Sequence, residues 1–457
     1  MNSLDKINEY VSQICQQIRW KKAHPRISEE MADHIIDGRD SYMAQGLDED
    51  TATEKAIADT GDTTIIGTQL DRIHRPKPQW TMLAAVVAFL MLGIFIDALI
   101  FNGLDGARVL WAIVGIGVML IAYFADFTLI GKYPKTIFFG IVFISIMLIM
   151  FSPMISGMFF YGQKATLLFP LAFAAIIFAT KNKGYRGILL CGLSFVLLCI
   201  IALMIPYMTG FAHFTIIGMA LLTLAIFKDW FGSIKKVYGF LLVYVPFLSM
   251  VTWTLTYLHA YQWARLKIVL NPYNDPQGAG WWGVKIRESL SSAELFGRSD
   301  VANIYHIHLT TAIDSRGEFF LTLLISHFGW ASFAVIISAL LFFIIKGFMG
   351  CIRQKSNLGL FVSLTIMMTF TAQVVSYIVW NLGFVLITPI SLPLMSHGNM
   401  VTLINLGLIG FMLSVFRTGD VVRDQKISPV AQQSKKQSGF FSWDDGKLTI
   451  NFKKLSW

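Results

Sequence analysis

Hydrophobic residues dominate one long part of the chain, from Trp80 to Arg417, and polar residues dominate both flanks. Most of its ten apolar segments reach the roughly 20 residues that a helix needs to cross about 30 Å of hydrocarbon. The pattern therefore predicts an all-α polytopic membrane protein with about ten transmembrane helices. The expected spans are residues 80–101, 107–126, 134–156, 164–180, 184–205, 211–228, 236–258, 319–346, 358–386 and 399–416.

The first 75 residues are polar and predict a separate, soluble bundle of short helices. Apolar side chains recur at helical spacing at Ile7, Val11, Ile14 and Ile18. Start and stop residues predict further helices from about residue 28, over 49–60 and over 63–73. This 1–75 domain resembles the helical prefix domains that precede some bacterial permeases, which carry no catalytic motif.

Composition supports the membrane interpretation and fixes an expected orientation. Hydrophobic residues make up 55% of the chain and charged residues 14%, whereas soluble proteins carry about a quarter charged residues. The net charge of +9 would favour nucleic acid in a soluble protein, but here Lys and Arg gather in alternate short connections. Since basic connections stay inside, both termini are expected to be cytoplasmic, and no nucleic-acid partner is expected. The tail, 418–457, is predicted to be flexible, with a basic end that contacts membrane lipid.

One connection, 259–318, is far longer than the others and faces outward in this topology. Its sequence NPYNDPQGAG is dense in turn formers, and its tryptophans suit a membrane–water interface. Non-helical backbone is tolerated at membrane depth only where protein or a water-filled cavity covers it. We therefore expect the chemistry of the protein in this loop; the alternative is an ordered surface or re-entrant loop.

Several ionisable residues lie where apolar spans begin or end. Glu318 directly precedes Phe319, and a carboxylate that is partly withdrawn from water suits the role of a general base. The alternative is a carboxylate at a helix N-terminus that interacts favourably with the helix dipole. Asp97 and Arg108 are expected to pair across a short turn. His306, His308 and Asp314 have a loose ligand-like spacing, but such residues in a polar loop are more often solvated. We therefore predict no metal site and no certain cofactor, and leave a divalent cation open.

Three motifs between residues 80 and 417 resemble the SEDS (shape, elongation, division and sporulation) family, which includes FtsW, RodA and SpoVE. In the first, LNPYNDPQGAGWW followed by ESLSSAELFGRS matches a family loop, including its Asn-Pro and Asp-Pro pairs. In the second, AIDSRGEFFLTLLISHFGW places Asp314 on a family Glu and Glu318 on the family's catalytic Asp. In the third, QVVSYIVWNLGFVLITPISLPLMSHGN aligns without gaps and keeps Gln373 and Ser396.

The resemblance implies a glycosyltransferase of the bacterial cytoplasmic membrane, in cell division, cell shape or sporulation. It would polymerise lipid II, an undecaprenyl-pyrophosphate-linked disaccharide-pentapeptide, together with a class B penicillin-binding protein. Glu318 would be the general base, with Asp314 as a second catalytic candidate. The candidate substrate-binding residues are Arg265, Lys267, Asn271, Asp275, Lys285, Gln373 and Ser396.

Departures from the family pattern keep two other functions open. The family's basic stretch after the third span has no counterpart, and Phe169 stands where a family motif has Lys. The catalytic Asp is replaced by Glu318, which keeps the acid–base chemistry with a longer reach. The alternatives are a non-catalytic membrane scaffold or regulator of a penicillin-binding protein, and a transporter of a lipid-linked precursor.

Overall fold

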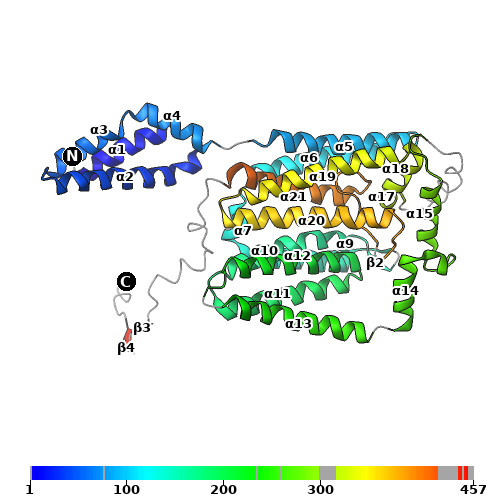
Figure 1. Cartoon of the computed structure of the whole chain (residues 1–457). Coiled ribbons are helices and arrows are strands. Elements are labelled where there is room, and N and C mark those ends of the chain that lie inside the picture. The colour runs from blue at the N-terminus through cyan, green and yellow to red at the C-terminus, as the bar shows by residue number, and fades with distance from the viewer. Residues whose placement is uncertain are drawn as a thin grey trace. The chain divides into compact units, whose positions relative to one another are not determined.

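The structure is a computed structural model that describes residues 3–75, 78–155, 157–232, 235–257, 259–297, 315–386, 388–419, 441–444 and 447–450. The chain divides into two compact units, one formed by the N-terminal helices α1–α4 and one that holds all the membrane helices (Figure 1). Each unit has its own packed interior and is described separately below.

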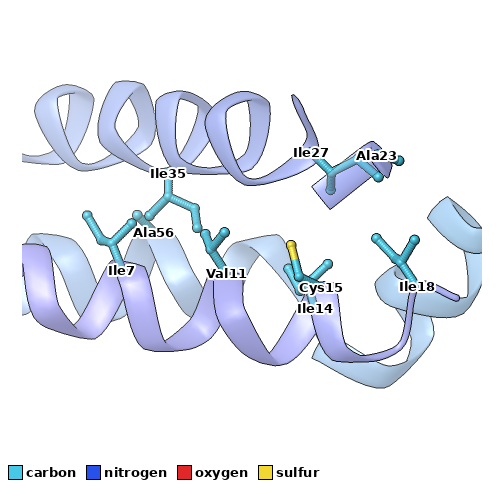
Figure 2. Packing of buried hydrophobic residues seen from close by; sticks show 9 residues of the cluster. All are labelled: Ile7, Val11, Ile14, Cys15, Ile18, Ala23, Ile27, Ile35 and Ala56. Carbon is cyan, nitrogen blue, oxygen red and sulfur yellow. The ribbon is translucent and has the colours of Figure 1, made fainter. Parts of the chain in front are cut away.

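The N-terminal unit is a bundle of α1 (Ser3–Gln16), α2 (His24–Ala44), α3 (Glu49–Thr60) and α4 (Thr63–His74), with a short 3₁₀ turn η1 (Lys21–Ala23). Figure 2 shows one apolar face of α1 packed against α2 and α3. Asp48 and Asp62 cap α3 and α4 by accepting hydrogen bonds from backbone amides. The Thr64 hydroxyl and these amides lower the pKa of Asp62, because they stabilise its charged form. The core of the unit contains Ile7, Val11, Ile14, Cys15, Ile18, Ala23, Ile27, Ile35 and Ala56.

The second unit contains ten helices long and apolar enough to cross a membrane, among the residues that the structure describes. This agrees with the expected all-α polytopic fold. Most of these helices run along one another (Figure 1), and α6 packs against α21 along much of its length. The spans are α5 (Trp80–Ile100), α6 (Gly106–Phe124), α8 (Pro134–Phe151), the continuous Gly162–Ala179 stretch, α11 (Gly184–Met204), α12 (Met208–Phe227), α13 (Lys236–Thr256), α19 (Trp330–Ile352), α20 (Asn357–Asn381) and α21 (Asn399–Thr418).

Short elements connect several of the spans. A five-residue helix, α7 (Thr128–Lys132), precedes α8. The strands β1 (Met154–Ile155) and β2 (Met158–Phe159) form an antiparallel hairpin after it, where the sequence predicted that the third span would continue to residue 156. The Gly162–Ala179 span is built from α9 (Gly162–Ala165), a 3₁₀ turn η2 (Thr166–Leu168) and α10 (Phe169–Ala179).

The prediction of one span over 319–346 is wrong. The structure divides this run into α18 (Phe320–Phe328) and α19 (Trp330–Ile352), with a four-residue turn of helix, α17 (Ser315–Glu318), before them. The break falls at Gly329, whose φ of +86° lies in the left-handed region that glycine adopts without steric cost. Residues 320–326 of α18 are buried, so this short helix packs inside the bundle, and the helix that is long and apolar enough to cross a membrane begins at Trp330.

The long connection contains more helix than its composition indicated. It holds α14 (Ala260–Leu270), a 3₁₀ turn η3 (Pro272–Asn274) and α15 (Trp281–Ser291), and α14 runs across the ends of the membrane helices (Figure 1). Residues 298–314 lie outside the described part of the chain. In the tail, β3 (Phe441–Asp444) pairs with β4 (Lys447–Ile450), while the expected flexible linker before them lies outside the described residues.

Candidate functional site

Glu318 ends α17, and the backbone around it is held by side chains of α20. The Tyr377 hydroxyl donates to the Gly317 carbonyl at 2.7 Å and accepts from the Phe320 amide at 3.0 Å. The Asn381 amide nitrogen donates to the Glu318 carbonyl at 3.0 Å. The turn between α17 and α18 is therefore held through main-chain groups, and the Glu318 side chain is half-buried.

Asn381 also fastens the first turn of α18. Its side-chain oxygen accepts from the Thr322 amide at 3.0 Å and from the Thr322 hydroxyl at 2.9 Å. Both residues are buried, where an unpaired polar group costs about 1–3 kcal/mol. The start of α18 is thus tied to the end of α20 in one arrangement.

The extended segment between α20 and α21, residues 388–398, forms a second support for the Glu318 turn. A Cβ atom added to Gly317 would lie 2.6 Å from the His397 carbonyl oxygen, so the two backbones are in direct contact. The Ser396 hydroxyl accepts from the Leu392 amide at 2.8 Å and also interacts with Tyr377. The segment and α20 therefore meet around the same residues that hold Glu318.

Two tyrosines interact electrostatically with Glu318, and its neighbour Phe319 makes an aromatic contact. Burial raises the pKa of Tyr207, which precedes α12, and the nearby charge of Glu318 raises that pKa further. Glu318 also interacts electrostatically with Tyr377. Phe319 stacks on Trp282 of α15, with ring centroids 4.8 Å apart. The site thus brings together Tyr207, which precedes α12, with residues of α15, α17, α18 and α20, although α12 and α20 are more than a hundred residues apart in the sequence.

The three cations expected at a pyrophosphate differ in their surroundings. Arg265 and Lys267 are exposed on α14, and neither side chain has a hydrogen bond or ion pair to another described residue. Lys285 on α15 forms an ion pair with Glu288 at 2.9 Å, with both side chains partly buried. The described contacts bring none of the three to Glu318, so their role toward substrate stays a prediction.

Three other predicted substrate contacts lie in structural hydrogen bonds. The Asn271 side-chain oxygen accepts from the Tyr273 amide at 3.3 Å, and Asp275 accepts from the amides of Gly278 and Ala279 at 3.1 and 2.8 Å. Gln373 is buried on α20 and exchanges two 3.0 Å hydrogen bonds with Asn405 of α21. Their substrate role stays a prediction, as does the catalytic role of Asp314, which lies outside the described residues.

Sequence reasoning missed the residues that support the site. Tyr377 and Asn381 lie in an apolar stretch and read as ordinary core positions of a span. Arg287 was also missed: its guanidinium donates to the Leu270 carbonyl at 3.2 Å and lies over the Phe384 ring, 5.0 Å from its centroid. Arg287 therefore links the end of α14 to the connection after α20.

The arrangement offers the Glu318 carboxylate on a backbone that is held in place, with Tyr207 and Tyr377 within electrostatic range and the neighbouring Phe319 stacked on Trp282. A carboxylate fixed in this way can accept a proton from a bound hydroxyl, provided that the hydroxyl reaches hydrogen-bonding distance. The geometry therefore supports proton abstraction at the loop-bearing end of the membrane unit.

Two curated relatives share sequence with part of the chain. One is described as probable peptidoglycan glycosyltransferase FtsW of Trichlorobacter lovleyi, with 23% identity over 159 residues, which cover 34% of this chain and 40% of that protein. The other carries the same description in Borreliella burgdorferi, with 23% identity over 158 residues, covering 35% and 43%. The chain thus spans about two fifths of the length of these relatives.

Solved structures share the fold over a longer part of the chain. A chain from a peptidoglycan synthase complex that coordinates polymerization and crosslinking superposes with a TM-score of 0.58 at 16% identity, covering 76% of this chain and 99% of that chain. A mutant of the rod shape-determining protein RodA of Thermus thermophilus gives a TM-score of 0.50 at 14% identity, covering 75% and 98%. At these identities the likeness shows the helical membrane fold alone.

The family match covers all ten membrane spans and leaves the N-terminal unit outside. Residues 79–420 match the FtsW/RodA/SpoVE model, which is described as cell cycle protein. This confirms the resemblance drawn from the three motifs. The chain is an integral membrane protein that belongs to the FtsW/RodA/SpoVE family.

Proposed function

We propose that this protein is a divergent peptidoglycan glycosyltransferase that polymerises lipid II at the outer face of the bacterial cytoplasmic membrane. Both termini lie in the cytoplasm, and a class B penicillin-binding protein is its partner. The observation that carries the proposal is the placement of Glu318 at a turn that Tyr377 and Asn381 hold through its main chain. Family membership and the peptidoglycan relatives support the substrate class.

In the proposed reaction Glu318 takes the proton from a hydroxyl of the acceptor sugar. The acceptor oxygen then attacks the anomeric carbon of the donor, and a new glycosidic C–O bond forms as the bond to the pyrophosphate oxygen breaks. Undecaprenyl pyrophosphate leaves with the electron pair of that bond. Arg265 and Lys267, which are exposed on α14, are proposed to offset its negative charge, an electrostatic role.

The test gives purified protein lipid II, alone and with a cognate penicillin-binding protein, and sizes the products. Wild-type protein is expected to make polymer, and Glu318→Gln to reduce the rate by about 100- to 10,000-fold, the range that general-base catalysis contributes. Glu318→Asp keeps a carboxylate and is expected to retain more activity than Glu318→Gln. Folded wild-type protein that makes no polymer under either condition, and does not bind lipid II, would refute the proposal.

A scaffold that regulates a penicillin-binding protein is the second candidate. The ion pair of Lys285 with Glu288 favours it, because a paired cation offers less charge to a pyrophosphate. Cells in which Glu318→Gln supports growth as well as the wild type would point to this function. A transporter would instead move lipid II across liposomes without polymerising it.

A further inference from the structure

A buried ion pair at the ends of α5 and α6 contacts the segment that supports the Glu318 turn. Arg108 Nη1 lies 2.8 Å from Asp97 Oδ2, and the two side chains are only 8% and 4% exposed. Arg108 Nη2 also donates a hydrogen bond to the carbonyl of Met395, a residue 287 positions away in the sequence. The sequence indicated the pair with Asp97 but not this third partner.

The contact fastens the 388–398 segment closely to the α5–α6 pair. A Cβ atom on Gly93 of α5 would lie 2.3 Å from the same Met395 oxygen, so the helix backbone touches the segment there. Beside Met395, Leu394 has a φ of +69°, which costs a side-chain-bearing residue about 1–2 kcal/mol. Such a conformation persists only where the surroundings hold it in place.

The other contacts of the segment lead to the Glu318 turn. Directly after Met395, Ser396 interacts with Tyr377, and the His397 carbonyl contacts Gly317. At the far end, the Tyr207 hydroxyl donates to the Thr388 carbonyl at 3.2 Å. The segment is thus held at Thr388 and at Met395, and it touches the turn through the two residues that follow Met395.

We propose that Arg108, oriented by Asp97, is a positioning residue for Glu318 that acts through the Met395 carbonyl and the 388–398 segment. The effect on activity rests on the proposed function, whereas the effect on the segment does not. Arg108 does not touch the reacting atoms in this proposal. It fixes where the carboxylate lies, and a displacement of about 1 Å in a reacting group can cost about 100-fold in rate.

Removing one charge would leave the other buried and unpaired, which alone could unfold the protein. The decisive variant is therefore the double substitution Asp97→Leu/Arg108→Met, which replaces both charges by apolar side chains and loses the donor to Met395. Arg108→Lys keeps a charge near Asp97 and a donor. The control for the loss of an ion pair is Asp229→Leu/Lys236→Met, because Lys236 and Asp229 form an exposed ion pair, at 2.9 Å, where α13 begins.

The first readout is amide hydrogen exchange of the full-length protein in nanodiscs, which needs no activity. The double variant is expected to exchange faster in residues 388–398 and 315–320 than the wild type, with α11 and α13 unchanged. The control is expected to leave both regions protected. Wild-type protection in both regions of the double variant, or a rise that is uniform over the protein, would overturn the proposal.

The second readout is the kinetics of lipid II polymerisation. The double variant is expected to lower kcat by about 10- to 100-fold with KM within about twofold, because position and not binding is lost. Arg108→Lys is expected to recover part of kcat. An unchanged kcat, or a loss that follows only the folded fraction, would contradict a positioning role. If wild-type protein makes no polymer, the proposed function fails and the exchange data alone decide this proposal.

Discussion

At the scale of single residues, the Tyr377 hydroxyl forms hydrogen bonds with two main-chain groups, one on each side of Glu318. It donates to Gly317 and accepts from Phe320, and the residue is fully buried. This one oxygen atom of a neighbouring helix thus contributes two of the hydrogen bonds that hold the turn, and Asn381 contributes a third.

Tyr377→Phe is expected to destabilise the protein by about 1–3 kcal/mol, since it leaves a buried amide and a carbonyl without this partner. The thermal unfolding midpoint in detergent measures the effect. Tyr123→Phe is the control, because Tyr123 is also buried, with 5% of its surface exposed, and its hydroxyl has no hydrogen bond to another described residue. Equal midpoints for the two variants would show that the Tyr377 hydroxyl does not hold the turn.

The sequence identified Glu318 and the Asp97–Arg108 pair because charges are conspicuous beside apolar spans. It could not identify Tyr377, Asn381 or the Met395 contact. A tyrosine in an apolar helix looks like any core aromatic residue, and the Met395 link joins positions 287 residues apart. Partners of this kind exist only once the helices have packed.

At the scale of elements, the division of residues 320–352 into α18 and α19 decides where the site lies. The run is uniformly apolar, so hydropathy alone could not separate a short buried helix from a membrane span. Gly329 marks the break between the two helices, but an isolated glycine in an apolar run can be interpreted in several ways. The helices α14 and α15 were missed for the opposite reason, since their polar composition and the prolines between them favoured loop.

Gly329→Ala is expected to destabilise the protein by at least about 1–2 kcal/mol, the cost of left-handed backbone for a residue with a Cβ. The new methyl group would also lie 2.5 Å from the Leu295 carbonyl oxygen. Thermal midpoints and amide exchange of residues 293–297 report both effects. The control is Gly140→Ala in α8, where no atom lies within 4 Å of the added carbon. A Gly329→Ala protein as stable as this control would refute the strained break.

At the scale of the whole molecule, the ten spans follow from composition, because a bilayer requires long apolar helices. The orientation follows only from the distribution of Lys and Arg, so it needs its own measurement. The chain suits cysteine labelling, since Cys15, Cys191 and Cys351 are buried and only Cys199 is partly accessible.

A cysteine at Tyr273, in the long connection, is expected to react with a membrane-impermeant maleimide added to intact cells. A cysteine at Met43, in the N-terminal unit, is expected to react only after the cells are permeabilised. Both side chains are exposed, 53% and 42%, so accessibility within the fold does not limit either reaction. The reverse labelling pattern would place the N-terminal unit outside and exclude a role for Glu318 at the outer face.

The Glu318 turn is held by hydrogen bonds to the backbone carbonyls of residues 317 and 318 and the amide of residue 320. These groups are the same whatever side chain residue 318 carries. An exchange of the acid at this position therefore leaves these three main-chain hydrogen-bonding groups in place. That independence would let one lineage keep an enzyme, lengthen its base by a methylene, or turn the same frame into a protein that only binds. Membership of the family and catalytic activity therefore have to be established by different experiments.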